Sequence, residues 1–542
     1  MRNATRYFAG LSMMALVVGL LSAPVRPATG DSEKDPASVI RVTPPAPVFD
    51  EGKRLAELAE RRARVARTIG PKAILVLFST EPRVYANDVD YEYRQENNLY
   101  YLTNLKQKGA TLVLMPGNPQ MPEVLFLPRR NPRSEVWTGH MYSSAEASQA
   151  SGIKEIWEAG EFEPFMRALR TRQAYRPKAE GLLMSNGVSI TTPAVGNSDA
   201  AGANGLESLF AAVGKGEAEL YLLVPPEGES REYRQEQNFA VQWARSATGF
   251  NVRNASPTFA AMRLRKSPME LEVLQHAIDI TIEAHERAQT IANRAQWEYE
   301  VDSEVVYTYK RRNADHWGYP SIVGCGPSAT TLHYIESQAP VKSGDLLLMD
   351  VGAEYDHYTA DVTRTFPVNG KFSPLQAEVY QIVYDAQEAA AKQIRPGATI
   401  EAVQKAATEV IKNGLLKLGL ITDVNSNQYR IWYMHGSSHW LGMNVHDVGN
   451  YSTPLEPGMV FTNEPGIYVR LDALENLPKN AENEKFIAAV RPAFEKYKGI
   501  GVRIEDDIVV TADGCRWMTA ALPRSIADIE SFIAKARREQ LR

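Results

Sequence analysis

Four acidic residues stand in or directly after apolar runs that have the composition of buried β-strands. Charged residues usually avoid such strands unless they are paired or bind a metal ion. Four clustered negative charges would repel one another and raise one another's pKa, and divalent cations would neutralise them. A charged edge strand explains any one of these acids but not all four. The acids, with their strand-like runs, are Asp350 (346–351), Asp361, Glu464 (459–462) and Glu505 (502–511).

The spacing of Asp350 and Asp361 is typical of two strands that are joined by a short turn. A turn centred between Tyr355 and Asp356 would place the two aspartates directly opposite each other. Side chains paired in this way have Cβ atoms roughly 5 Å apart. Two such carboxylates could span a pair of cations ~3.5–4 Å apart. The sequence therefore predicts a hairpin that carries two metal ligands on one sheet face.

Three histidines, His435, His439 and His446, fall within one glycine-containing segment of twelve residues. A lone histidine is usually a structural residue, but three together beside glycines favour a site. Carboxylate oxygens with one imidazole suit manganese better than zinc or cobalt. Two such ions, with Mn²⁺ the best match to these ligands, would activate a water for attack near neutral pH.

The elements that must position these residues fall into two regions. A helical pattern over 53–69, an apolar strand over 73–78 and further alternating elements up to about 262 indicate an α/β domain. A new unit begins at Ser267, where Ser-Pro-Met-Glu has the form of a capping box, and a second helix start lies at Ser373. The second half is mixed α+β. We therefore expect domains over 53–262 and 263–542.

The first residues differ from the rest of the chain. Arg2 and Arg6 precede an apolar run from Phe8 to Leu21, and small residues follow. This layout is typical of a signal peptide over 1–28, followed by a linker over 29–52, and favours export to the periplasm or medium. The apolar run is shorter than the ~20 residues of a membrane-spanning helix. The net charge of −5 gives no reason to expect nucleic acid as a partner.

The acids and the histidine, in this order and with these flanks, resemble the five-ligand set of the "pita-bread" metallopeptidases, and most closely bacterial aminopeptidase P. The resemblance covers most of residues 55–525 and includes the upstream segments Tyr93–Asn97 and Glu135–Trp137. It implies a creatinase-like N-terminal domain followed by a pita-bread catalytic domain.

The resemblance also implies roles for the ligands. Asp350 would chelate one metal ion, Asp361 and Glu505 would bridge both ions, and His439 and Glu464 would bind the other. Glu464 would also move the proton of the attacking water.

Five further residues match positions of the family outside this ligand set. His333 would steady the tetrahedral intermediate, and His446 would contact the scissile carbonyl. His435, Tyr468 and Arg503 would hold substrate and ligands, although structural support is an equal alternative for these three.

The substrates that the resemblance implies are peptides with proline at the second position. The chain is then expected to form a dimer or tetramer, in which Trp137 helps to close a neighbouring subunit's site. Prolidase, which cleaves only dipeptides, is the nearest alternative, and an inactive peptide-binding relative is a second. Asn444 stands where the family usually has Asp, and segments near 181–215 and 471–498 resemble insertions, the second a loop near the site entrance.

Overall fold

The computed structural model describes residues 38–185, 205–224, 232–246 and 248–540. Met1–Val39 and Ile40–Arg542 are separate units, and every element below belongs to the second. The signal peptide predicted over 1–28 lies outside the described residues. Within the described ranges, no helix combines the length and apolarity needed to cross a membrane.

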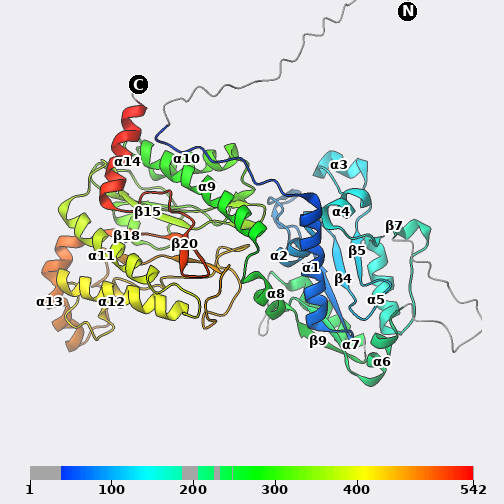
Figure 1. The fold of residues 1–542 in the computed structure, drawn as a ribbon. Coiled ribbons are helices and arrows are strands. Elements are labelled where there is room, and N and C mark those ends of the chain that lie inside the picture. The colour runs from blue at the N-terminus through cyan, green and yellow to red at the C-terminus, as the bar shows by residue number, and fades with distance from the viewer. Residues whose placement is uncertain (1–37, 186–204, 225–231, 247, 541–542) are drawn as a thin grey trace, which may run out of the picture. The chain divides into compact units, whose positions relative to one another are not determined.

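A seven-stranded mixed sheet, with the order β7-β6-β5-β4-β1-β8-β9, forms the centre of the N-terminal region (Figure 1). All six residues of β1 (Ala73–Phe78) are buried. Leu75 and Leu77 pack into a core with α1, α2 and α4, whereas Ile74 and Val76 pack into a core with α5, α6 and α7. Helices therefore cover both faces of the sheet, and this explains why β1 is apolar throughout rather than alternating.

The strands of this sheet and its covering helices have the following bounds: α1 (Glu51–Ile69), α2 (Asn97–Thr103), β4 (Thr111–Leu114), β5 (Glu123–Leu127), α4 (Ser144–Ser151), β6 (Ile156–Glu158), α5 (Phe162–Arg170), β7 (Leu182–Met184), α6 (Glu207–Lys215), β8 (Ala218–Leu222), α7 (Arg234–Ser246) and β9 (Phe250–Asn254). A small hairpin and two further helices complete the region: β2 (Val84–Ala86), β3 (Val89–Asp90), α3 (Pro132–Thr138) and α8 (Ser256–Arg263).

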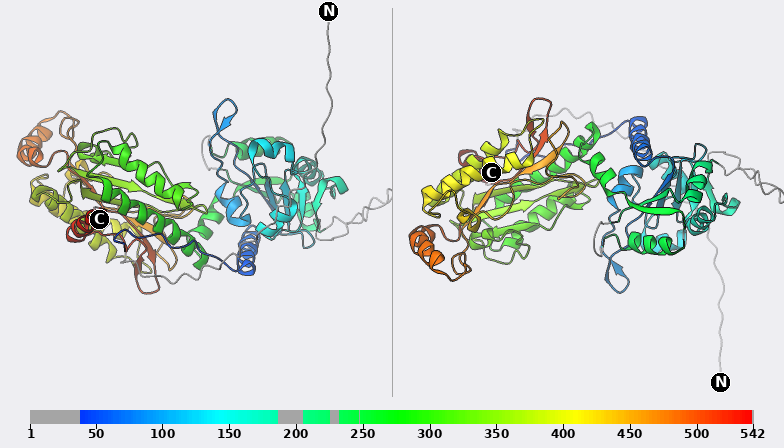
Figure 2. Two further views of the ribbon diagram at one scale, coloured as in Figure 1. Left: turned by 90° about the horizontal axis from the view of Figure 1, so that it is seen from above. Right: turned by 90° about the horizontal axis from the view of Figure 1, so that it is seen from below.

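The C-terminal region consists of short antiparallel sheets with helices packed on them (Figures 1 and 2). Helix α9 lies against β13, β14 and β15, and helix α11 lies against β16, β17 and β18. The bounds are α9 (Pro268–Ile291), α10 (Glu298–Arg311), β10 (His316–Trp317), β11 (Ile322–Cys325), β12 (Leu346–Val351), β13 (Ala353–Tyr355), β14 (Tyr358–Thr359), β15 (Val362–Pro367), α11 (Pro374–Ala391), α12 (Ile400–Leu418), β16 (Val460–Asn463), β17 (Gly466–Tyr468), α13 (Ala481–Tyr497), β18 (Gly501–Arg503), β19 (Asp506–Val510), β20 (Cys515–Trp517) and α14 (Ile526–Glu539).

The two helix starts predicted from sequence are confirmed in detail. Ser267 accepts a hydrogen bond from the backbone of Glu270, whose side chain returns one to the Ser267 backbone. Ser373 forms the same reciprocal capping box with Gln376. Both helices therefore start where the Ser-Pro pattern places them, and the α/β region followed by a mixed α+β region is observed.

Two expectations about connecting segments are corrected. Residues 471–498 are not mainly a loop, because α13 occupies most of them and its Phe494 ring packs 6.1 Å from Trp432. Within the predicted linker, helix α1 already begins at Glu51, and the Thr43 side chain is buried against Glu283 of α9. Part of the segment near 181–215 lies outside the described residues, and its remainder contains β7 and α6.

Candidate metal centre

The hairpin that carries Asp350 and Asp361 forms, but its register differs from the expected one. Asp350 of β12 pairs with Thr363 of β15, so Asp361 lies one diagonal position away rather than directly opposite. The cause is the turn, because Asp356 and His357 both have positive φ, at 49° and 69°, and close the hairpin one residue further along. The shift of two residues keeps both aspartates on one face, as predicted.

The face shared by the aspartates is confirmed by a residue that the sequence argument missed. The hydroxyl of Tyr319 donates to Asp350 Oδ1 at 2.5 Å and lies 2.6 Å from Asp361 Oδ1. Tyr319 precedes these acids by 31 and 42 residues, and nothing in its local sequence distinguishes it. The Tyr319 hydroxyl therefore connects the two predicted ligands by hydrogen bonds.

His439 is brought to the hairpin by strand β16. Its backbone N–H donates to the Thr462 hydroxyl, and its Nε2 lies 3.2 Å from Asp361 and 3.4 Å from Glu464. The other ring nitrogen, Nδ1, faces the Trp440 carbonyl at 3.2 Å, which leaves Nε2 directed at the acids. Burial would lower the pKa of His439, but the hydrogen bond to Asp361 and the nearby carboxylates raise it to about 9.

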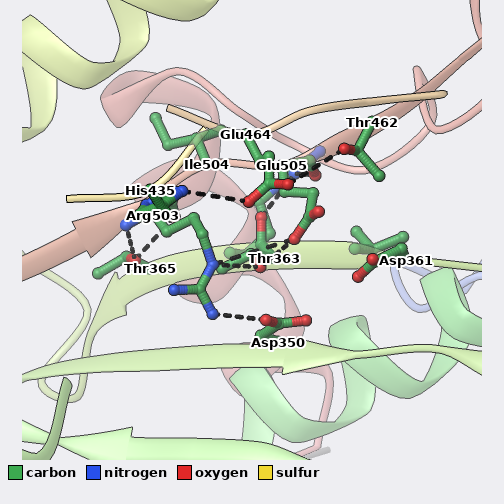
Figure 3. A network of polar contacts seen from close by, with 12 residues as sticks. Asp350, Asp361, Thr363, Thr365, His435, Thr462, Glu464, Arg503, Ile504 and Glu505 are labelled. Carbon is green, nitrogen blue, oxygen red and sulfur yellow. Dashed lines mark hydrogen bonds and ion pairs between the residues drawn. The ribbon is translucent and has the colours of Figure 1, made fainter. Parts of the chain in front are cut away.

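Glu464 follows the last residue of β16, as the sequence predicts. The Thr462 hydroxyl donates to its Oε1 at 3.2 Å, and His435 lies 3.6 Å from its other oxygen (Figure 3). Burial raises the pKa of Glu464 to about 7. The positive charge of His439 lowers this pKa, and the negative charge of Asp361 raises it.

Glu505 reaches the site from a break between two strands, not from within one. The predicted strand over 502–511 divides into β18, which pairs with β17, and β19, which pairs with β16. Glu505 lies at the change of partner, where its N–H donates to the Thr363 carbonyl and its Oε2 accepts from the Thr363 hydroxyl at 2.6 Å (Figure 3). Burial and the charges of Asp361 and Glu464 raise the pKa of Glu505 well above its usual value.

Three of the predicted ligands converge most closely. One atom each of Asp361, His439 and Glu505 lie within 4.8 Å of one another. Buried carboxylates with raised pKa and an imidazole directed at them form a donor set that suits a divalent cation. Asp350, at the edge of this group, already has protein partners. Arg503 donates to its Oδ2 (Figure 3), and Tyr319 donates to its Oδ1.

The three predicted substrate-holding residues form one hydrogen-bonded chain that ends at Asp350. Arg503 Nη1 donates to the Tyr468 hydroxyl at 2.9 Å, and this hydroxyl lies 2.8 Å from His435 Nε2. His435 Nδ1 faces the Gly436 carbonyl, so Nε2 accepts from Tyr468. Burial and the charge of Arg503 lower the pKa of His435 to about 3, so the imidazole is neutral.

His333 and His446 lie on the open side of this group. The His446 ring stacks edge-on to His439, with 4.3 Å between ring centroids. Burial lowers the pKa of His446, and the charges of His439 and His333 lower it further. His333 has the same effect on His435, and its own side chain is exposed. His446 therefore lies beside the metal ligand His439, and His333 lies within electrostatic reach of His435 and His446.

A contact from the N-terminal region reaches the histidine-containing segment. Arg94 Nη2 donates to the Met443 carbonyl at 2.7 Å, and its Nε lies 2.8 Å from Glu354. Asn97 donates to the Asn444 side-chain oxygen at 2.7 Å. The segment Tyr93–Asn97 thus has a structural reason to be similar to the family, and Asn444 keeps the acceptor that an Asp would offer there.

Comparison with known proteins places these features in context. Residues 272–512 match Metallopeptidase family M24, and residues 58–175 match the Aminopeptidase P, N-terminal domain. Xaa-Pro aminopeptidase from Haemophilus influenzae is 33% identical over 486 residues, covering 88% of this chain and 97% of that protein. Human Xaa-Pro aminopeptidase 3 is 29% identical over 477 residues, covering 86% and 82%.

Solved structures agree with the sequence relatives. An aminopeptidase from Pseudomonas aeruginosa superposes with a TM-score of 0.72 at 31% identity, covering 89% of this chain and 99% of that one. Escherichia coli aminopeptidase P with the inhibitor Pro-Leu gives 0.71 at 30% identity and the same coverage.

The fold and the buried donor set define a metallopeptidase that binds divalent metal. The relatives narrow this class, since those named above are aminopeptidases and none is a prolidase. The chain belongs to the Xaa-Pro aminopeptidase family, within Metallopeptidase family M24. It is a hydrolase that acts as an exopeptidase at the amino end of its substrates.

Proposed function

We propose that this protein removes the first residue of peptides in which proline is second, with two divalent metal ions, best suited by Mn²⁺, in its site. The observation that carries this proposal is the convergence of Asp361, His439 and Glu505 within 4.8 Å, with Asp350 and Glu464 beside them. The relatives named Xaa-Pro aminopeptidase support the specificity. The oxygen-rich donor set supports manganese.

The five ligands are proposed to share the ions unequally. Asp350 would hold one ion, His439 and Glu464 would hold the other, and Asp361 and Glu505 would be shared by both. When bound, the ions supply an activated water and polarise the carbonyl that it attacks. The chain supplies the hydrogen bonds that orient these ligands, from Tyr319, Thr363 and Thr462 among others.

Proton movement is assigned to Glu464. A bond to proline is a tertiary amide without an N–H, so its nitrogen must receive a proton as it leaves. Glu464 takes a proton from the attacking water and gives it to this nitrogen. His333 steadies the tetrahedral intermediate by a hydrogen bond, and His446 contacts the scissile carbonyl.

His435, Tyr468 and Arg503 are proposed to line the place of the proline ring. Their hydrogen-bonded chain fixes the neutral imidazole and the phenol ring in one orientation, and Arg503 also holds Asp350. A rigid wall of this kind favours a ring over an extended side chain.

We also propose domains over 53–262 and 263–542 after a signal peptide (1–28), with export to the periplasm or medium. A dimer or tetramer is proposed as the working form. The Trp137 side chain, 87% exposed, supports a subunit contact, because so large an apolar surface is usually covered.

The test is hydrolysis of an Xaa-Pro-Xaa tripeptide against the matching Xaa-Pro dipeptide and an Xaa-Ala-Xaa tripeptide. The expected result is release of the first residue from the proline tripeptide alone, loss of activity with a chelator, and recovery with Mn²⁺. Cleavage confined to the dipeptide would replace the proposal with prolidase. Two ions per chain by elemental analysis are expected, and one would remove the bridging roles.

A further inference from the structure

The loop over residues 331–340, which carries His333, contains neither helix nor strand. Its shape must therefore come from contacts with other parts of the chain. Ser337 within it has φ of 48°, a left-handed conformation that is unfavourable for a serine, and its side chain is buried. An irregular loop that is held in such a conformation needs specific anchors.

One buried carboxylate provides those anchors. Glu298, in the first turn of α10, is fully buried and accepts from the backbone of Ala339 and the hydroxyl of Tyr334, both at 2.8 Å on Oε2. Its Oε1 accepts from the backbone of Cys325 at 2.6 Å, next to η3 (Gly326–Thr330). The Glu298 N–H also donates to the Ala339 carbonyl at 3.0 Å. One side chain thus fastens both ends of the loop and the strand β11 before it.

The contacts require a carboxylate rather than an amide. All three groups that face Glu298 are donors, and ionised carboxylates offer acceptors only. The donors to its two oxygens are two backbone N–H groups and one hydroxyl, none of them charged, so its charge is met by these donors and by the start of α10. A glutamine would turn an N–H₂ group toward donors and leave buried groups without partners.

The anchor also connects to the site itself. Tyr334 follows His333 directly, and its ring packs against a small cluster that contains Leu348 and Tyr468. Tyr468 is the residue whose hydroxyl contacts His435 and Arg503. A movement of Tyr334 would therefore displace His333 and disturb the wall beside it.

We propose that Glu298 is a positioning residue for the reaction: through Tyr334 and Ala339 it fixes the 331–340 loop so that His333 faces the metal centre. This inference rests on the role of His333 given under Proposed function. Glu298 touches none of the predicted metal ligands, so its effect is expected in the rate and not in metal binding.

The experiment compares Glu298→Gln with Glu300→Gln as a matched control. Glu300 lies in the same helical turn, and its side chain accepts from the backbone of Gln296 at its own helix start. Loss of an orienting partner typically costs ~10–100-fold in activity. We expect kcat of E298Q to fall by about that factor, with KM and bound metal unchanged, and E300Q to match the parent. Tyr334→Phe, which keeps the ring packing, should show a smaller fall of the same kind.

The role of Glu298 through His333 is separated from general destabilisation by repeating the change in the His333→Ala background. If Glu298 acts through His333, E298Q should lower kcat little further in that background. An equal fall in both backgrounds, or a parent-like kcat for both E298Q and Y334F, would overturn the proposal.

Hydrogen exchange of residues 331–340 should accelerate in E298Q and not in E300Q, and unchanged exchange would also overturn it. Full activity of His333→Ala would instead refute the role proposed for His333. The exchange result would still show whether Glu298 holds the loop.

Discussion

Two groups of carboxylates in the C-terminal region differ in how their charge is balanced. Glu283 of helix α9 is buried against the segment around Thr43, whereas Asp361, Glu505 and the half-buried Glu464 belong to the metal centre. Glu283 receives two hydrogen bonds from Arg312 at 2.6 and 2.7 Å, one from Arg287 at 2.8 Å, and two from Thr43. Burial alone would raise the pKa of Glu283, but these donors outweigh it and lower the pKa to about 2.

The carboxylates of the metal centre have less compensation: His439 lowers the pKa of Asp361 and Glu464, but burial outweighs its effect. The charge of Arg503 lowers the pKa of Glu505, but Arg503 donates its hydrogen bond to Asp350 and not to Glu505. The pKa of Asp361, Glu464 and Glu505 is raised in every case, first by burial. A structural carboxylate thus has its counter-charge supplied by the chain, whereas these carboxylates are arranged for cations from outside.

The largest effect is expected for Glu505→Gln. The amide keeps the shape of the side chain but removes a bridging charge, so metal content and kcat should fall by more than the ~100-fold typical of a change outside the ligand set. Elemental analysis and tripeptide hydrolysis measure both. The thermal midpoint of the metal-free protein should rise at the same time, because one of several repelling charges is gone.

Glu283→Gln is the contrasting change and should act with the opposite pattern. Leaving Arg312 and Arg287 without a buried partner should lower the free energy of unfolding by about 3–5 kcal/mol. Metal content and kcat of the folded protein should match the parent. Loss of metal in this variant, or a rise in its stability, would contradict the distinction between the two groups.

The pH dependence from Glu283 follows from the sign of its shift. Its folded pKa, about 2, lies below the usual 4.5, so the stability it contributes is present above pH 4.5. This contribution is lost as the pH falls from 4.5 toward 2. Urea denaturation of the parent and of Glu283→Gln should therefore converge on acidification.

Much of this arrangement could be predicted from sequence because it depends on local pattern. The capping boxes at Ser267 and Ser373 and the apolar run of β1 are short-range features, and the structure has them where they are expected. The acids were identified because a charge in an apolar run is conspicuous without any knowledge of its partner. The family resemblance then supplied the ligand set to which these acids belong and the roles of its members.

The predictions that were wrong or missing concern contacts between segments that are distant in the sequence. The hairpin turn at Asp356 and His357 has left-handed residues without glycine, so no turn sequence marked its centre. The apolar pattern over 502–511 continues through the point where the strand changes partner at Glu505. Tyr319 and Glu298 were missed because their partners are separated in sequence by 27 to 42 residues.

The smallest effect is expected for a change at Glu286. Its charge is balanced less fully than that of Glu283 but more fully than those of the metal-centre carboxylates. It accepts from the Arg41 backbone at 2.6 Å and has the Arg41 side chain 3.6 Å away, but burial still raises its pKa to about 7. Because this folded pKa exceeds the usual 4.5, Glu286 is fully compatible with folding below pH 4.5 and becomes a cost as the pH rises toward 7.

Glu286→Gln cannot ionise and should remove this cost. We expect its free energy of unfolding to exceed that of the parent by about 1–3 kcal/mol at pH 8 and to differ little at pH 4. Urea denaturation at the two pH values measures the difference, with Glu283→Gln as the variant of opposite sign. A gain of equal size at both pH values would mean that packing, and not the uncompensated charge, distinguishes Glu286 from its neighbour on the same helix.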